Sequence, residues 1–204
     1  MSNQKSNKAP MQVERVRQVE GLKYLNTFVI DYKTKSGQKK QWELVSRQNQ
    51  DRLEKEIFQD KSYTDGAMVF ATDEEKTKVV ILKEYRVSAG KYVYMFPAGL
   101  VEAGESIEKA SVREFKEETG MGFVPKYVER ERYVSVGIVN ERVNIVYGTY
   151  FGQASQKHQE DNEHAEILII DREQALYILE NEEVSIRTAM LLQGFFRLNP
   201  YFHG

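Results

Sequence analysis

Three glutamates near the middle of the chain have the type and spacing to act together chemically. Glu114, Glu117 and Glu118 lie in the segment PAGLVEAGESIEKASVREFKEETGMG. Ser106 can cap the start of a helix, and a glycine can end it in a left-handed conformation, so this segment predicts a helix over residues 107–119. At about 100° per residue, Glu114 and Glu118 lie within roughly 40° of each other, with Glu117 beside them. The predicted helix therefore concentrates three carboxylates on adjoining positions.

These carboxylates continue a stripe of small and apolar residues that should point inward. Like charges at i and i+4 repel by a few tenths of a kcal/mol even in water, and by far more when desolvated, so a cation must compensate. Lys109 and Lys116 lie around the opposite side of the helix, and Arg113 reaches only some of the carboxylates. A hard divalent cation such as Mg²⁺ fits, because it binds through one or two carboxylates, water and phosphate oxygens. The alternative is a solvated acidic helix.

The spacing of the segment resembles the Nudix box of the Nudix hydrolase superfamily. Gly99, five residues, Glu105, seven residues and then the run from Arg113 to Met121 fill its defining positions. Phe115 departs from the pattern, where a smaller aliphatic residue is usual. The resemblance implies a loop–helix–loop that binds Mg²⁺ or Mn²⁺. It also implies attack by water on a phosphorus of a nucleoside diphosphate linked to another moiety.

The same resemblance implies roles for individual residues. The implied metal ligands are oxygen atoms of the box and of the residue before it: Glu114, Glu118, Glu117 as an auxiliary ligand, and the Ala98 carbonyl. Arg113 is expected to orient the carboxylates, with Glu105 as its partner.

Residues ahead of the box resemble the ADP-ribose and nucleotide-sugar pyrophosphatase branch of the superfamily. Glu84-Tyr85-Arg86 and the later run FPAGLVE stand in the relation seen in that branch. Arg86 ends a predicted strand, where its guanidinium can grip a diphosphate with two parallel hydrogen bonds; the alternative is a structural ion pair. Leu100, in the same motif, is expected to bind substrate.

Other candidate substrate residues lie far from the box. Arg47 resembles the position that reaches the nucleotide from an N-terminal domain. Glu141 follows SVGIVN, which resembles the family's SPG segment with valine in place of proline, and is a candidate for the substrate or metal shell. Trp42 is expected in the core, with stacking on a base as the alternative.

The attacking water needs a group that orients it or takes its proton. In this branch that role resembles a glutamate on a loop before the last strand, where the acidic stretch 159–166 lies. Glu163 is the first choice, Glu160 the second and Glu166 the third, and Glu117 in the box is the fallback. The alternative is a solvated loop without a catalytic part.

The resemblance implies an enzyme that hydrolyses ADP-ribose to AMP and ribose 5-phosphate. Another nucleoside diphosphate sugar such as GDP-mannose is the alternative substrate, because the box does not specify what flanks the diphosphate. A nucleotide-sensing module is a more distant alternative. It is disfavoured because the box is complete and the helices predicted near the C-terminus offer no basic recognition helix.

The elements around the box predict an α/β or α+β fold with a mixed sheet, and the resemblance implies an α/β/α sandwich with a small N-terminal antiparallel β domain. The runs YLNTFVIDYKT and KKQWELVSR predict a hairpin that turns at Gly37, and residues 48–61 are interpreted as a linker or surface insertion. Further strands are predicted at 67–70, 78–82, about 127–134, 143–151 and 167–170, and helices at 172–179 and 184–196.

The expected organisation has three parts. Residues 1–20 are expected to be a flexible tail, 21–62 the antiparallel β domain and 63–204 the Nudix hydrolase domain. The resemblance implies a homodimer in which the N-terminal domain is exchanged between subunits.

Composition excludes several other functions. The 204 residues hold 29 Lys and Arg against 31 Asp and Glu, so no basic field exists to bind nucleic acid. The chain has no cysteine, which excludes disulfides and thiolate chemistry. The densest apolar runs have strand length, so no membrane partner is expected. These features favour a soluble cytoplasmic protein.

Overall fold

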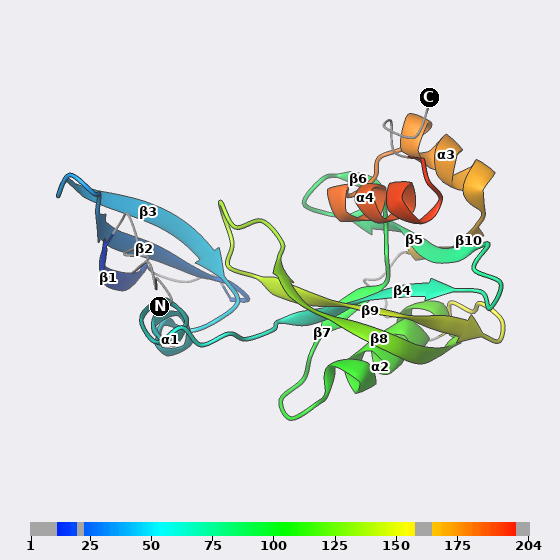
Figure 1. The fold of residues 1–204 in the computed structure, drawn as a ribbon, viewed down its shortest axis with the longest axis horizontal. Helices are drawn as coiled ribbons and strands as arrows, with labels where there is room; N and C mark the ends of the chain where they lie inside the picture. The colour runs from blue at the N-terminus through cyan, green and yellow to red at the C-terminus, as the bar shows by residue number, and fades with distance from the viewer. Residues whose placement is uncertain (1–11, 20–22, 158–164, 199–204) are drawn as a thin grey trace, which may run out of the picture. The chain divides into compact units, whose positions relative to one another are not determined.

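The structure is a computed structural model that describes residues 12–19, 23–157 and 165–198 (Figure 1). The chain forms two compact units. The first unit holds the residues up to 64 together with 132–142, and the second holds 65–131 and the residues from 143 onward. The segment 132–142 thus leaves the second unit and returns to it.

The first unit is built on a three-stranded antiparallel sheet. Its strands are β1 (Gln12–Val19), β2 (Asn26–Lys33) and β3 (Lys39–Ser46), in the order β1-β2-β3. Gly37, between β2 and β3, has φ +82°, a backbone conformation that glycine adopts without strain. The predicted hairpin is therefore confirmed.

Two sequence expectations about this unit are wrong. Residues 12–19, assigned to a flexible tail, form β1, and residues 48–61, interpreted as a linker or surface insertion, contain helix α1 (Gln50–Gln59), which contributes to the core of this unit. Asn49 caps α1 by accepting a hydrogen bond from the N–H of Arg52 at 3.0 Å. Leu53 of α1 is fully buried in a core with three residues of the sheet: Val16, Phe28 and Leu44. Packing against the sheet thus stabilises a helix that its polar composition obscured.

Trp42 on β3 is also not where the sequence analysis expected it. Its side chain is 46% exposed, so the core assignment is wrong. Because alternate residues of a strand share a face, Trp42 extends the face on which Leu44 is buried.

The second unit is built on a seven-stranded sheet. Its strands are β4 (Gly66–Thr72), β5 (Val79–Arg86), β6 (Lys91–Met95), β7 (Ala98–Leu100), β8 (Gly122–Tyr133), β9 (Arg142–Phe151) and β10 (Ala165–Ile170). The main order is β10-β5-β4-β9-β8, with β6 paired to β5 and β7 to β4. Strands β4 and β9 are parallel, whereas β5 is antiparallel to β4, β6 and β10. The predicted mixed sheet is confirmed.

Helices cover both faces of this sheet, as Figure 1 shows. Helix α2 (Ile107–Thr119) packs on one face, and α3 (Arg172–Asn181) with α4 (Ile186–Phe195) on the other. Strand β4 is buried on both sides: Val69 belongs to the core beneath α2, and Phe70 to the core beneath α3 and α4. This arrangement confirms the predicted α/β/α sandwich.

None of the helices in the described part of the chain is both long and apolar enough to cross a membrane.

Candidate active site

Helix α2 has the bounds that its capping residues predict. The side chain of Ser106 accepts a hydrogen bond from the N–H of Lys109 at 3.3 Å. Gly120 ends the helix with φ +72°, and its N–H donates to the carbonyl of Lys116 at 2.8 Å. Phe115, the departure from the box pattern, is fully buried and packs on the ring of Phe123. The unusual residue therefore anchors the helix to the sheet.

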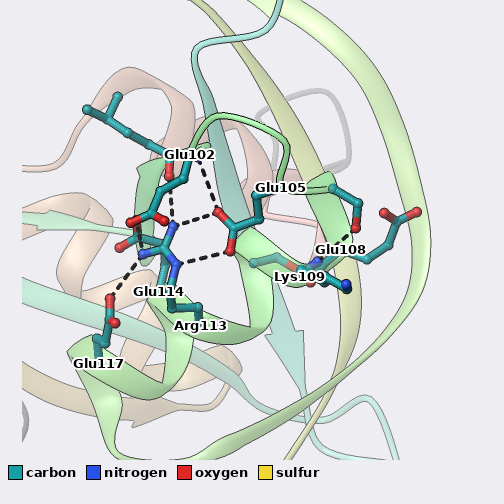
Figure 2. Close-up of polar contacts among 10 residues, drawn as sticks. Glu102, Glu105, Glu108, Lys109, Arg113, Glu114 and Glu117 are labelled. Atoms are coloured by element: carbon teal, nitrogen blue, oxygen red, sulfur yellow. Dashed lines mark hydrogen bonds and ion pairs between the residues drawn. The ribbon is translucent and has the colours of Figure 1, made fainter.

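Arg113 is the centre of the carboxylate cluster on α2, as Figure 2 shows. It donates to Glu105 through Nε at 3.1 Å and Nη2 at 2.9 Å. Its Nη1 donates to Glu114 at 2.9 Å and to Glu117 at 3.2 Å, and Nη2 also donates to the Leu100 carbonyl at 3.0 Å. One guanidinium therefore orients three carboxylates, and the expected pairing with Glu105 is confirmed.

Within this network, Arg113 and Glu105 stabilise each other's charged forms. The hydrogen bond from Arg113 is the largest cause that holds the pKa of Glu105 below its ordinary value. In return, the hydrogen bond to Glu105 raises the pKa of Arg113, with Glu114 contributing in the same direction. Glu105 is thus ionised at neutral pH and fixes the guanidinium that orients the other carboxylates.

Strand β7 contacts the carboxylates of Glu114 and Glu118. A Cβ added at Gly99 would lie 1.8 Å from Cδ of Glu114 and 2.1 Å from each of its carboxylate oxygens. Glycine is therefore needed for this carboxylate to rest against the backbone. The carboxylate of Glu118 accepts a hydrogen bond from the N–H of Ala98 at 3.1 Å. Glu114 and Glu118, predicted to share a helix face, both contact β7.

The donor set suits a hard divalent cation. Among the described residues, no three acidic or histidine side chains are grouped closely enough to hold an ion by themselves. Mg²⁺ typically uses one or two carboxylates and completes its shell with water and phosphate oxygens. Glu114 and Glu118, each in contact with the strand that begins at Ala98, supply that number of carboxylates. The assignment of these residues and Glu117 as ligands stays a prediction.

Arg86 lies at the end of β5 and forms an ion pair. Its Nη1 donates to Glu84 at 2.6 Å, and its side chain is 47% exposed. Glu84 was not predicted as the partner of Arg86, although residues i and i+2 of a strand point to the same side. The ion pair that it kept as the alternative is present, and binding of a diphosphate by Arg86 stays a prediction.

Within the first unit, the structure brings together two residues chosen separately from the sequence. Nε of Arg47 donates to Oε1 of Glu141 at 3.2 Å. The N–H of Val45 donates to the carbonyl of Ile138 at 3.0 Å, which joins the end of β3 to the segment 134–141. Arg47 and Glu141 line a recess of about 190 Å³. No local signal could have revealed this pairing, because 94 positions separate the two residues.

The candidates for the group that handles the water proton are only partly described. Glu160 and Glu163 lie outside the described residues. Glu166 lies on β10 opposite Lys83 and is exposed. Glu117 is also exposed and contacts Arg113. The choice among these glutamates stays a prediction.

Known proteins are similar to this chain in sequence and in fold. A family model described as the NUDIX domain matches residues 62–190. The chain is 27% identical over 186 residues to a Caenorhabditis elegans protein that carries the name nudix hydrolase 2, covering 86% of this chain and 79% of that protein. It is 27% identical over 130 residues to the ADP-ribose pyrophosphatase of Bacillus subtilis, covering 63% of this chain and 70% of that protein.

The fold resembles a solved structure as well. A crystal structure of an ADP compounds hydrolase superposes with a TM-score of 0.69 at 18% identity, covering 92% of both chains. The family model spans the box, the seven-stranded sheet, α2 and α3, and ends within α4 at residue 190. The chain therefore belongs to the Nudix hydrolase family.

Proposed function

We propose that this chain uses a divalent metal ion, Mg²⁺ or Mn²⁺, to hydrolyse ADP-ribose to AMP and ribose 5-phosphate. The observation that carries the proposal is the carboxylate cluster: Arg113 orients Glu105, Glu114 and Glu117 while β7 holds Glu114 and Glu118. The similarity to a protein named ADP-ribose pyrophosphatase supports the choice of substrate.

Glu114 and Glu118 would hold the cation, with Glu117 and the Ala98 carbonyl as further oxygen donors. When bound, the cation acts as a Lewis acid toward the diphosphate and lowers the pKa of a bound water. The space that Gly99 leaves for the Glu114 carboxylate supports this assignment, because a larger residue would displace a ligand.

The residues of the chain itself have three tasks in the proposed reaction. Arg113 keeps the carboxylates in place. Arg86 exchanges Glu84 for the diphosphate of the substrate and balances the charge that develops on it. A glutamate takes the proton of the water as its oxygen bonds to phosphorus and the bridging P–O bond breaks; Glu163 is the first candidate, followed by Glu160, with Glu117 in the box as the fallback.

We further infer a homodimer that exchanges its N-terminal unit, with Arg47 and Glu141 contributing to substrate binding. The resemblance to a branch in which an N-terminal antiparallel element is exchanged between subunits supports this inference, because the first unit is built on such a sheet. Light scattering after gel filtration tests it: a mass of two chains agrees with the proposal, and a monomer at micromolar concentration contradicts it. The lack of cysteine agrees with a cytoplasmic location.

The substrate is tested by incubating the protein with ADP-ribose, GDP-mannose and other nucleoside diphosphate sugars, with Mg²⁺, with Mn²⁺ and with a chelator. The proposal expects AMP and ribose 5-phosphate from ADP-ribose, faster than from the other compounds and abolished by the chelator. Faster hydrolysis of GDP-mannose would contradict ADP-ribose as the substrate but would agree with metal-dependent hydrolysis of a diphosphate. An absence of metal-stimulated hydrolysis on every compound would contradict the enzyme and favour a sensing module.

A further inference from the structure

The second unit contains a recess that the carboxylate site does not use. It has a volume of about 510 Å³ and lies between α4 and strands β4 and β9. Small-molecule sites commonly have volumes of about 300–1,000 Å³. Phe70 and Tyr147 line it from the sheet, on the face beneath α3 and α4. Helix α2 with its carboxylates packs on the opposite face.

The recess is also displaced along the sheet from the box. Met68 of β4 pairs with Ala98, the first residue of β7 and the residue directly before the box. Thr72, which lines the recess, lies four residues farther along β4, or about 13 Å at the rise of a β-strand. Because face and position both differ, this recess is a separate place in the fold.

Aromatic rings form the wall of the recess. The ring centroid of Phe70 lies 5.3 Å from that of Tyr147 and 5.3 Å from that of Phe195 on α4. The hydroxyl of Tyr147 contacts the carboxylate of Glu129 at 3.4 Å, which helps to fix this ring. Such a wall suits a flat aromatic ring, which gains from stacking and edge contacts beyond its apolar burial.

The charge around the recess favours an anion. Lys76 and Lys126 line it, and none of the described lining residues is acidic, although the chain as a whole carries a net charge of −2. In the same turn, Glu74 and Glu75 precede Lys76 without lining the recess, and Asp73 is engaged elsewhere. Its carboxylate accepts hydrogen bonds from the N–H groups of Thr77 and Lys78. The two ammonium groups therefore remain suited to an incoming anion.

We propose that this recess is a second ligand site, which binds a flat aromatic ring carrying a phosphate, as in a nucleoside monophosphate. The ring packs among Phe70, Tyr147 and Phe195, and the phosphate meets Lys76 and Lys126. This site does not depend on the hydrolytic function proposed above, because none of the box carboxylates takes part.

AMP is the probe, with methyl signals of the methionines followed by nuclear magnetic resonance. Met190 lines the recess and is 67% exposed, whereas Met121 is buried in the core beneath α2. Addition of AMP is expected to shift the Met190 signal in a saturable way and to leave Met121 unchanged. Adenosine, which lacks the phosphate, is expected to bind about tenfold more weakly, since charge-assisted hydrogen bonds are lost.

Two variants locate the binding by calorimetry. Gly194→Leu is designed to fill the recess, because a Cβ at this lining position meets no atom within 4 Å. Leucine is also a better helix former than glycine, so α4 should persist. The affinity for AMP is expected to fall by about tenfold or more, whereas Gln193→Leu, next to it but outside the described lining, should change it less than about twofold.

The double variant Lys76→Gln/Lys126→Gln tests the charge without filling the recess. We expect it to weaken the binding of AMP about tenfold and to leave the affinity for adenosine unchanged. It also keeps the test decisive if Gly194→Leu does not fold. An unshifted Met190 signal at millimolar AMP, equal affinities for adenosine and AMP, or unchanged AMP affinity in the double variant would overturn the proposal. Hydrolysis of ADP-ribose is measured separately. An inactive protein would contradict the proposed function but not the binding of AMP in this recess.

Discussion

Two arginine–carboxylate sites in this chain differ in how firmly the arginine is held. In the second unit, the Arg113 side chain is 28% exposed and donates to Glu105, Glu114, Glu117 and a backbone carbonyl. In the first unit, the Arg47 side chain is 46% exposed and donates to Glu141 at 3.2 Å. Exposed ion pairs are worth about 0–1 kcal/mol, so Arg47 can exchange its partner cheaply, whereas Arg113 is fixed by several bonds at once.

The difference between Arg113 and Arg47 predicts different effects on catalysis. A guanidinium tied to several carboxylates preorganises them and should affect turnover. An exposed guanidinium with an exchangeable partner should affect substrate affinity. The following variants test that division.

The largest effect is expected from the carboxylates that contact β7. Glu114→Gln and Glu118→Gln should each lower kcat for ADP-ribose by about 10³-fold, since a cation ligand worth several kcal/mol in the transition state is lost. Circular dichroism should show an intact fold. Glu108→Gln, exposed on the same helix, is the matched control and should remain within about twofold of the parent. Near-normal turnover in both box variants would contradict the assignment.

A smaller loss is expected from Gly99→Ala. The new methyl group occupies the place of the Glu114 carboxylate, which must move, and kcat should fall by about 10²-fold with a small change in Tm. Gly137→Ala serves as the control, because a Cβ there meets no atom within 4 Å. If Gly99→Ala retained full activity, the contact between β7 and Glu114 would have no part in catalysis.

Arg47→Ala should act on binding. We expect KM for ADP-ribose to rise about tenfold with kcat within about twofold, the pattern of a contact made equally in ground and transition states. Steady-state kinetics on the purified variant measure both values. A large fall in kcat at unchanged KM would break the distinction between the two arginine sites.

The smallest effect concerns stability and depends on pH. Glu105 has a pKa below its ordinary value of 4.5 because Arg113 hydrogen-bonds to its charged form. The ionised Glu105 therefore adds its full contribution to the free energy of unfolding at pH values above its pKa in the unfolded chain. That contribution is lost as the pH falls through its lower pKa in the folded protein. Urea unfolding from pH 7 to pH 3 should show that Glu105→Gln destabilises the protein near neutrality and that this difference shrinks in acid. A difference that grows in acid would contradict the network.

Local signals predicted the parts of the fold that depend on local chemistry. Ser106 and Gly120 gave the bounds of α2, because a capping hydroxyl and a left-handed glycine act on their own neighbours. Gly37 marked the hairpin between β2 and β3 for the same reason. The box itself placed Arg113 beside Glu105, because its spacing resembles a known pattern.

The remaining features depend on contacts between distant segments. Helix α1 was not predicted, because it is stabilised by the burial of Leu53 against a sheet formed by earlier segments of the chain. The short strands β6 and β7 were missed because each pairs with a longer strand rather than showing a pattern of its own. The pairing of Arg47 with Glu141 and the recess beneath α4 likewise arise only once the chain has folded.

The most direct test of the carboxylate site is a crystal soaked with Mn²⁺ and the nonhydrolysable α,β-methylene analogue of ADP-ribose. Anomalous scattering locates the metal without reference to the protein density. We expect a manganese peak that contacts the carboxylates of Glu114 and Glu118 and the phosphonate oxygens of the analogue. An analogue bound elsewhere, or manganese bound away from both glutamates, would contradict it.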